Sequence, residues 1–432
     1  MEIDGDRVMQ TAWKFASVPV LVALFTFMLA IRLLPFDDVV TEQGVLYSGN
    51  DPWYHMRIVR LIVAHFPSSP QFDAWSHFPY GTGRHSGFGG LFDQIIAFGA
   101  LVLGGGSPSP QTVDVVGAVA PAVFGAATII PAYFIVKMIA DRWTALLAAG
   151  ILALASGQFL NRTMVGSPDH QSAEALFGTI AVLGFMVALK AAYEHKPTTA
   201  HLEDRDLEGL RPFVSPAVLG GVGIASYLML WPPGVMLVFT FGVFGVLQIV
   251  RDHMSGKPID YTVFGVATPM LVAAVLTGLY AKSYELSSTG FSLLQPLLAV
   301  GIAVGMIYLY GLATSLDRRD HDPWHYPVAV AGSIAAFFAV MAIVYPRGIE
   351  MFSALIRRIY SFGILSSETA LTVAEIAPAS LPQAWTAFGF TFFLAVGALA
   401  LFVYRIVLED RPLELVVLLW SLTMISAYFT MV

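Results

Sequence analysis

Long apolar segments alternate with short polar connections along most of the chain. An α-helix needs about 20 mostly apolar residues to cross the hydrocarbon core of a bilayer, and each of eleven segments meets that requirement. They are residues 15–34, 112–136, 143–160, 171–190, 214–230, 233–250, 262–281, 292–314, 327–345, 384–404 and 413–431. The pattern therefore predicts an all-α polytopic membrane protein.

Two connections, residues 35–111 and 346–383, are much longer than the others. Long connections in a compact protein are usually functional or disordered. Both contain aromatic residues, in which disordered segments are poor, and the first also contains histidines. We therefore expect both to be external loops that carry function.

Composition agrees with a membrane protein and excludes several other classes. The 432 residues are 56% hydrophobic and 12% charged, with a mean hydropathy of +0.71. The formal net charge of −7 argues against a nucleic-acid partner. The chain has no cysteine, which excludes disulfides and thiolate metal sites. The N-terminal sequence MEIDGDRVMQTAWKF is too acidic and too long for a cleavable signal peptide, so we expect the first apolar segment to stay as a span.

The positive charges predict the orientation of the spans. Loops rich in Lys and Arg stay in the cytoplasm. With a cytoplasmic N-terminus, most Lys and Arg residues lie on that side: Arg7, Lys14, Lys137, Arg142, Lys190, Lys196, Arg205, Arg211, Arg251, Lys257, Arg318, Arg319, Arg405 and Arg411. The two long connections would then lie on the extracytoplasmic face.

Three of the acidic residues on that predicted external side are candidates for chemistry, and they come from separate parts of the sequence. They are Asp51 in GNDPWYHMR, Asp169 in NRTMVGSPDHQSAE and Glu375 in LTVAEIAPAS. Carboxylates near a membrane boundary are costly unless they are solvated, paired or bound to a cation. Because Mg²⁺ and Mn²⁺ take oxygen ligands, one shared metal ion would account for all three.

Each acid also has an ordinary local role. Asp51 could be a helix N-cap, with Pro52 at the first helical position. Asp169 could cap the apolar helix that follows it, and Glu375 could be a solvated loop residue. Capping and metal binding are compatible, because a cap fixes the backbone that directs the carboxylate.

Three basic side chains form a second group of candidates. Arg162 lies seven residues before Asp169 at the outer end of a predicted span. It could extend to the membrane surface or bind an anionic phosphate. His170 and His77 could donate hydrogen bonds to a phosphate or a sugar, or be ordinary surface histidines.

Four motifs, in this order, resemble those of the catalytic subunit of archaeal, single-subunit oligosaccharyltransferases: GNDPWYHMR, HFPYGTG, GQFLNRTMVGSPDHQSAEALF and TVAE. The resemblance runs from the first apolar segment to the last residue. It implies the GT-C glycosyltransferase fold and a multi-pass protein of the plasma membrane. It also implies transfer of an oligosaccharide from a dolichyl phosphate or diphosphate to the asparagine of N-x-S/T in secreted or membrane proteins.

The resemblance also implies roles for the acids. Asp51 and Glu375 match catalytic acids of the family, and together they could hold the acceptor amide. Asp51, Asp169 and Gln171 match the positions of ligands for Mn²⁺ or Mg²⁺. Gln171 is a departure, because relatives have Asp, Glu or His there; its amide oxygen can bind a hard cation but supplies no charge.

The basic residues have counterparts as well. Arg162 matches an arginine beside the lipid phosphate, with a catalytic role. His170 and His77 resemble histidines that face the lipid-linked donor. The family's W-W-D-Y-G motif, which reads the Ser/Thr of the sequon, does not occur in residues 1–432. We therefore expect these residues to form the transmembrane catalytic module, without the family's soluble C-terminal domain.

Two alternatives stay open at this point. Another GT-C transferase with a different acceptor would share the acidic first loop but lack the glutamate of TVAE. A polytopic transporter would place charged residues or broken helices near mid-membrane. Only LWPPGV at 230–235 suggests an interrupted segment, and it equally fits a tight turn between two spans.

Overall fold

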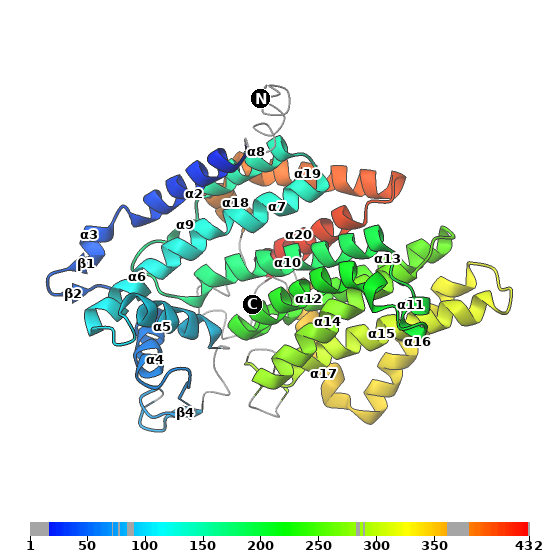
Figure 1. Cartoon of the computed structure of the whole chain (residues 1–432), viewed down its shortest axis with the longest axis horizontal. Coiled ribbons are helices and arrows are strands. Elements are labelled where there is room, and N and C mark those ends of the chain that lie inside the picture. Colours follow the sequence, from blue (N-terminus) through cyan, green and yellow to red (C-terminus); the bar gives the residue numbers. More distant parts are fainter. Residues whose placement is uncertain are drawn as a thin grey trace, which may run out of the picture. The chain divides into compact units, whose positions relative to one another are not determined.

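The computed structural model describes residues 17–70, 72–76, 78–83, 90–281, 286–287, 290–360 and 380–430. Those residues are mostly helical, which confirms the all-α prediction (Figure 1). They divide into two compact units: the first contains residues 1–183 and 229–231, and the second contains residues 184–228 and 232–432. Two predicted site residues, His77 and Glu375, lie outside the described residues.

The first unit contains the N-terminal span, the segment 35–111 and the start of a long helix. Its elements are α2 (Ser17–Leu33), α3 (Phe36–Val39), β1 (Val40–Thr41), β2 (Gly44–Val45), α4 (Asp51–His65), β3 (Phe72–Asp73), β4 (Thr82–Gly83), α5 (Leu91–Leu103), α6 (Pro110–Ala127), α7 (Ile129–Ile139), α8 (Arg142–Ala153), α9 (Gln158–Asn161) and the first half of α10 (His170–His195). The strands form two small antiparallel hairpins, β1 with β2 and β3 with β4. The described residues of the segment 35–111 therefore form folded structure.

Helices α4, α5 and α6 form the core of the first unit. Met56, Val59 and Ile62 recur at helical spacing on α4 and are fully buried. Phe92 and Ile96 do the same on α5. Burying one such side chain contributes about 1.5–3 kcal/mol. This packing holds the N-terminal turns of α4 and α5 rigidly, and those turns carry the polar residues described below.

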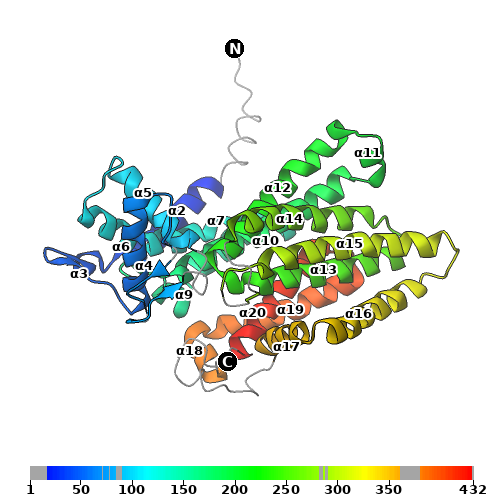
Figure 2. The ribbon, with the colours of Figure 1, turned by 90° about the horizontal axis from the view of Figure 1, so that it is seen from below.

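The second unit is a bundle of long helices. Its elements are the second half of α10, α11 (Thr199–Glu203), α12 (Leu207–Leu230) up to residue 228, η2 (Pro232–Gly234), α13 (Val235–Met254), α14 (Asp260–Tyr280), α15 (Leu294–Asp317), α16 (His325–Val344), α17 (Pro346–Tyr360), α18 (Leu381–Phe388), α19 (Phe390–Leu408) and α20 (Pro412–Thr430). Figure 2 shows α13, α14, α15 and α16 running side by side. LWPPGV forms the short turn η2 between two helices, as one of the two sequence interpretations expected.

Among the residues that the structure describes, ten helices are long and apolar enough to cross a membrane, against the eleven spans predicted. The difference lies at 143–160, where α8 has only 12 residues and ends at Ala153. Residues 154–157 are not helical, and Gly157, with a positive φ of 72°, directly precedes α9. Side chains of α8 still pack against α2, in a cluster that includes Met28, Ala145 and Ala149. The segment predicted as one span is therefore two helical pieces, and neither is long enough to cross a membrane by itself.

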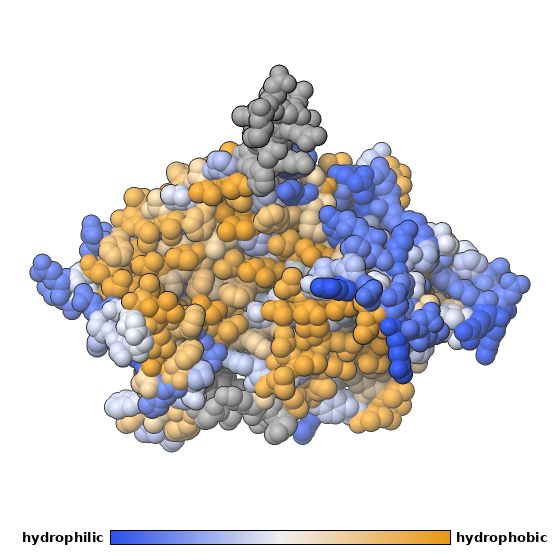
Figure 3. Space-filling view, viewed as in Figure 1, coloured by the Kyte–Doolittle hydropathy of each residue, from blue (hydrophilic) through white to orange (hydrophobic). Residues whose placement is uncertain are grey.

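The surface of the second unit supports the membrane assignment. On the face that Figure 3 displays, hydrophobic residues form a broad patch over its helices, and hydrophilic residues gather around α11. Large apolar side chains on α16 point outward, such as Phe337 and Ile343. Such an exposed apolar surface is expected where lipid replaces water. The protein is a multi-pass membrane protein.

Candidate functional site

Asp169 caps α10 at the point where the chain enters the helix. Its Oδ1 accepts a hydrogen bond from the backbone N–H of Gln171 at 3.4 Å, and its backbone carbonyl accepts from the Ser172 hydroxyl at 2.8 Å. The carboxylate is buried. The helix N-terminus favours a negative charge at this position. The predicted capping role is therefore confirmed, and it aims the Asp169 carboxylate into the interior of the first unit.

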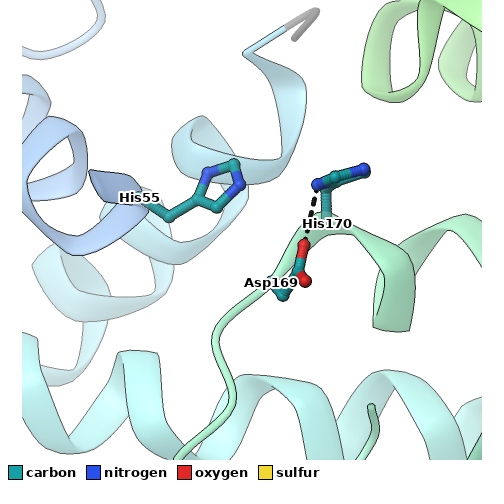
Figure 4. Close-up of side chains that lie close together, drawn as sticks. All are labelled: His55, Asp169 and His170. Carbon is teal, nitrogen blue, oxygen red and sulfur yellow. Dashed lines mark ion pairs between the residues drawn. The ribbon is translucent and has the colours of Figure 1, made fainter. Parts of the chain in front are cut away.

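Two histidines lie beside this carboxylate. His170 Nδ1 is 2.8 Å from Asp169 Oδ1. His55 extends from α4 towards both residues (Figure 4), and its ring centroid is 5.6 Å from that of His170. One potential ligand atom from each of His55, Asp169 and His170 lies within 4.8 Å of the other two, and all three residues are buried.

The His55 ring is held from its other side by α5. Its Nδ1 is 2.7 Å from Asp93 Oδ1, and the edge of the ring meets Phe92 with centroids 4.9 Å apart. Burial alone would lower the pKa of His55, but the nearby carboxylates of Asp93, Asp169 and Asp51 outweigh it and raise the pKa. The site therefore attracts positive charge.

Arg162 lies on the other side of Asp169. Its Nη1 is 3.2 Å from Asp169 Oδ2. Burial would raise the pKa of Asp169, but the hydrogen bond and charge of His170, with the charge of His55, lower it. Asp169 is therefore an ionised carboxylate with cationic or imidazole groups on both oxygens.

The segment that carries Arg162 is tied to the end of the first span. Arg32 Nε donates to Thr163 Oγ1 at 2.8 Å, and the Arg32 backbone carbonyl accepts from the Val165 N–H at 3.0 Å. Arg32 is fully buried. A side chain at Gly125 would collide with both Thr163 and Arg32. This fixed anchor keeps Arg162 close to Asp169.

The geometry fits a divalent metal ion. Two imidazole nitrogens and a carboxylate oxygen form a common ligand set for such ions. In an octahedral site with bonds of about 2.0–2.1 Å, opposite ligands of one ion lie about 4.0–4.2 Å apart. Ligand atoms within 4.8 Å of one another therefore need only small side-chain movements to close on a cation. Burial excludes most of the water that would compete for these ligands.

The structure places the other predicted ligands near this group. Asp51 is the first residue of α4, and Asn50 is the N-cap, one residue earlier than expected. Asp51 lies one helical turn before His55, on the same face. Gln171 contacts Asp169 through its backbone N–H. Neither is tested as a ligand by these contacts, so both stay predictions.

Sequence reasoning missed His55 and Asp93. The spacing of Asp51 and His55, four residues apart in a helix that Asn-Asp-Pro begins, was the signal that could have placed both on one face. Nothing comparable marks Asp93, because an acidic residue in a first helical turn usually serves the helix itself. Only the packing of α5 against α4 reveals its contact with His55.

Known proteins resemble this chain over nearly its whole length. The dolichyl-monophosphooligosaccharide–protein glycotransferase AglB of Haloferax volcanii is 37% identical over 407 residues, which cover 91% of this chain and 38% of that protein. The dolichyl-phosphooligosaccharide-protein glycotransferase 3 of Archaeoglobus fulgidus is 26% identical over 430 residues, which cover 95% of this chain and 47% of the relative. The chain thus spans less than half the length of these two relatives.

Solved structures show the same fold. One is the Archaeoglobus fulgidus oligosaccharyltransferase AglB in complex with an inhibitory peptide and a dolichol-phosphate. It superposes on this chain with a TM-score of 0.84 at 24% sequence identity, and the match covers 97% of this chain and 48% of the AglB chain. Another structure from that organism, a complex with zinc and sulfate, gives 0.75 at 22% identity, covering 95% and 47%. The family model "Oligosaccharyl transferase STT3, N-terminal" matches residues 20–428. The chain therefore belongs to the STT3 family of oligosaccharyl transferases.

Proposed function

We propose that this chain is the membrane-embedded catalytic part of an oligosaccharyltransferase. It would transfer an oligosaccharide from a dolichyl phosphate or diphosphate to the asparagine of N-x-S/T in a secreted or membrane polypeptide. Its membership of the STT3 family makes this the leading reaction. The observation that carries the proposal is the buried group of His55, Asp169 and His170 with Arg162 beside it. A cation site next to a guanidinium suits a substrate with an anionic phosphate leaving group.

The residues divide the work as follows. Asp51 and Glu375 accept hydrogen bonds from the acceptor carboxamide and so position a weak nucleophile. Arg162 binds the phosphate of the carrier, and His170 and His77 contribute further hydrogen bonds to the donor. Positioning of this kind can supply several kcal/mol of the barrier reduction. Nucleic acid has no place in this reaction.

A divalent cation is the cofactor of this proposal, either Mn²⁺ or Mg²⁺. When bound, it supplies Lewis-acid stabilisation of the negative charge on the departing phosphate oxygen. Asp169, with Asp51 and Gln171, would provide oxygen ligands, and His55 and His170 add imidazole nitrogens. The oxygen ligands suit both ions. Titrating the purified protein with each ion separates the two cases.

The proposed location of the reaction follows from the predicted topology. The site residues precede or follow spans at the ends predicted to lie outside the cytoplasm, so the active site faces the extracytoplasmic side of the plasma membrane. Lipid-linked donor and secreted acceptor would meet there. Cysteine labelling of Ser48→Cys and Ser255→Cys variants with an impermeant reagent tests this orientation; only Ser48→Cys is expected to react in intact cells.

A chimera tests the reaction itself. Residues 1–432 would replace the matching part of the Haloferax volcanii relative, in cells that lack their own enzyme. We expect the chimera to glycosylate a reporter with an N-x-T sequon and to ignore the matched Q-x-T reporter. The Asp169→Asn chimera should lose at least 100-fold in rate. A chimera that is inserted and folded but leaves the N-x-T reporter unmodified would contradict the proposal.

A further inference from the structure

Asp93 is a buried carboxylate beside the apolar core of the first unit. It lies in the first turn of α5, and the neighbouring inward residues of that helix, Phe92, Ile96 and Ala97, are packed into the core of the first unit. Burying a carboxylate costs several kcal/mol unless it is paired and hydrogen-bonded. Asp93 Oδ1 lies 2.7 Å from His55 Nδ1, which is itself buried.

Stability alone is a weak explanation for this pair. Buried ion pairs contribute little net stability, and well-packed apolar residues of similar size often do as well. The rest of the α4–α5 contact is already apolar and close-packed, with Met56, Ile62 and Ile96 fully buried. Asp93 is therefore better explained by what it does to His55.

The contact determines how His55 faces the candidate metal group. A carboxylate can only accept a hydrogen bond, so His55 donates from Nδ1–H. In the neutral imidazole that binds a metal, this hydrogen bond keeps the single proton on Nδ1, and Nε2 carries the lone pair. Figure 4 shows this ring extending towards Asp169 and His170. Carboxylates that hold the far nitrogen of a metal-binding histidine fix its tautomer and raise its basicity.

We propose that Asp93 is a positioning residue of the metal site, which holds His55 in the tautomer and orientation that present Nε2 to the cation. The inference rests on the metal site of the proposed function. It gives α5 a role in that site, because α5 carries the residue that orients the ligand His55. Losing such a partner typically weakens metal affinity by about 10- to 100-fold.

The test is Mn²⁺ titration of the purified full chain in detergent, by calorimetry and by the EPR signal of free Mn²⁺. Asp93→Ala should weaken Mn²⁺ binding about 10- to 100-fold. Asp93→Asn keeps the shape and an acceptor oxygen but loses the charge, so a smaller loss of about threefold or more is expected. Melting of the metal-free proteins, recorded in parallel, separates affinity from folding.

Asp114→Asn is the matched control. Asp114 also ties α4 to a neighbouring helix, through Arg60 at 2.6 Å, but it does not contact His55. Its Mn²⁺ affinity should stay within about twofold of the parent. A positioning role also predicts non-additivity: in a His55→Ala background, Asp93→Ala should have no further effect on Mn²⁺ affinity.

The outcomes are distinct. If both Asp93 variants bind Mn²⁺ within twofold of the parent, or if Asp93→Ala weakens binding equally in the His55→Ala background, the inference is wrong. If Asp169→Asn abolishes Mn²⁺ binding while His55→Ala does not change it, only the inference fails and the proposed metal site stands. If the parent chain binds no Mn²⁺, the metal part of the proposed function fails with it.

Discussion

Arg162 and Asp169 form an ion pair in which Nη1 lies 3.2 Å from Oδ2, while the other oxygen of the same carboxylate faces His170 at 2.8 Å. The residue proposed to bind phosphate and a residue proposed to bind the cation are thus direct neighbours. A cation that approaches Asp169 meets the positive charge of Arg162. The cation and phosphate sites are therefore electrostatically coupled.

Arg162→Ala should affect the two ligands in opposite directions. Removing the guanidinium leaves the Asp169 charge unopposed, so Mn²⁺ should bind more tightly, by about fivefold or more if the pair is worth roughly 1 kcal/mol. Dolichyl phosphate should bind more weakly, because its charge-assisted hydrogen bonds are lost. Calorimetry measures the Mn²⁺ affinity, and lipid-binding assays measure the affinity for dolichyl phosphate.

Arg162→Lys is the control for that prediction. It keeps the charge without the planar, bidentate donor, so its Mn²⁺ affinity should resemble that of the parent. Weaker Mn²⁺ binding by Arg162→Ala would show that the pair organises the cation site instead of competing with it.

Thr163→Val should destabilise the protein more than the loss of one hydroxyl group suggests. It leaves the buried Nε of Arg32 without the Thr163 acceptor that lies 2.8 Å away. An unsatisfied buried donor costs about 1–3 kcal/mol. Thermal melting in detergent measures this loss.

Adding Arg32→Met to Thr163→Val should then recover part of the stability, because the apolar side chain needs no partner. Arg32 has hydrogen bonds to Thr163 and to the Met28 carbonyl. If the double variant melts below Thr163→Val alone, other contacts of the guanidinium dominate, and the hydrogen bond to Thr163 is not its main role.

Gly220→Ala should destabilise the second unit. Within that unit, α10 and α12 touch at Gly184 and Gly220, and a Cβ at Gly220 would lie 2.6 Å from the Gly184 carbonyl oxygen. Close contact of small residues is what brings membrane helices together, and overpacking typically costs about 1–3 kcal/mol. Gly301→Ala on α15 is the control, since nothing lies within 4 Å of its Cβ position. Equal melting of the two variants would argue against the close contact.

Asp73→Asn should weaken the segment 72–83 in a pH-dependent way. Burial would raise the pKa of Asp73, but hydrogen bonds from the Ser76 hydroxyl and the Trp75 N–H, with the charge of Arg57, lower that pKa below its ordinary value. A lowered folded-state pKa means that the stabilisation is complete above the unfolded-state pKa and is lost as pH falls through the folded-state value. Limited proteolysis at pH 7 and pH 3 measures the stability of this segment. The gap between Asp73→Asn and the parent should be largest at pH 7 and narrow in acid; a constant gap would contradict this.

Much of this protein could be predicted from local sequence, because apolar length and helix signals act over a few residues. The spans follow from continuous apolar runs, and Asp169 caps α10 as the Ser-Pro-Asp sequence indicated. The break between α8 and α9 was missed, since Gly157 lies inside an apolar run whose average hydropathy hides one residue with a positive φ. His77 and Glu375, which motif resemblance supplied, lie outside the described residues.

The candidate site itself depended on tertiary structure. The sequence alone determined that this is a membrane protein, that Asp51, Asp169 and Arg162 are candidates, and that they flank apolar helices. It could not determine that His55 meets Asp169, nor that Asp93, 38 residues further along the chain, holds His55. Helical periodicity predicts which face of α4 or α5 is buried, but not which other helix that face meets. The packing of α4 against α5 and near the start of α10 determined these contacts of His55. Only close packing of buried apolar side chains specifies which polar groups come within hydrogen-bond distance.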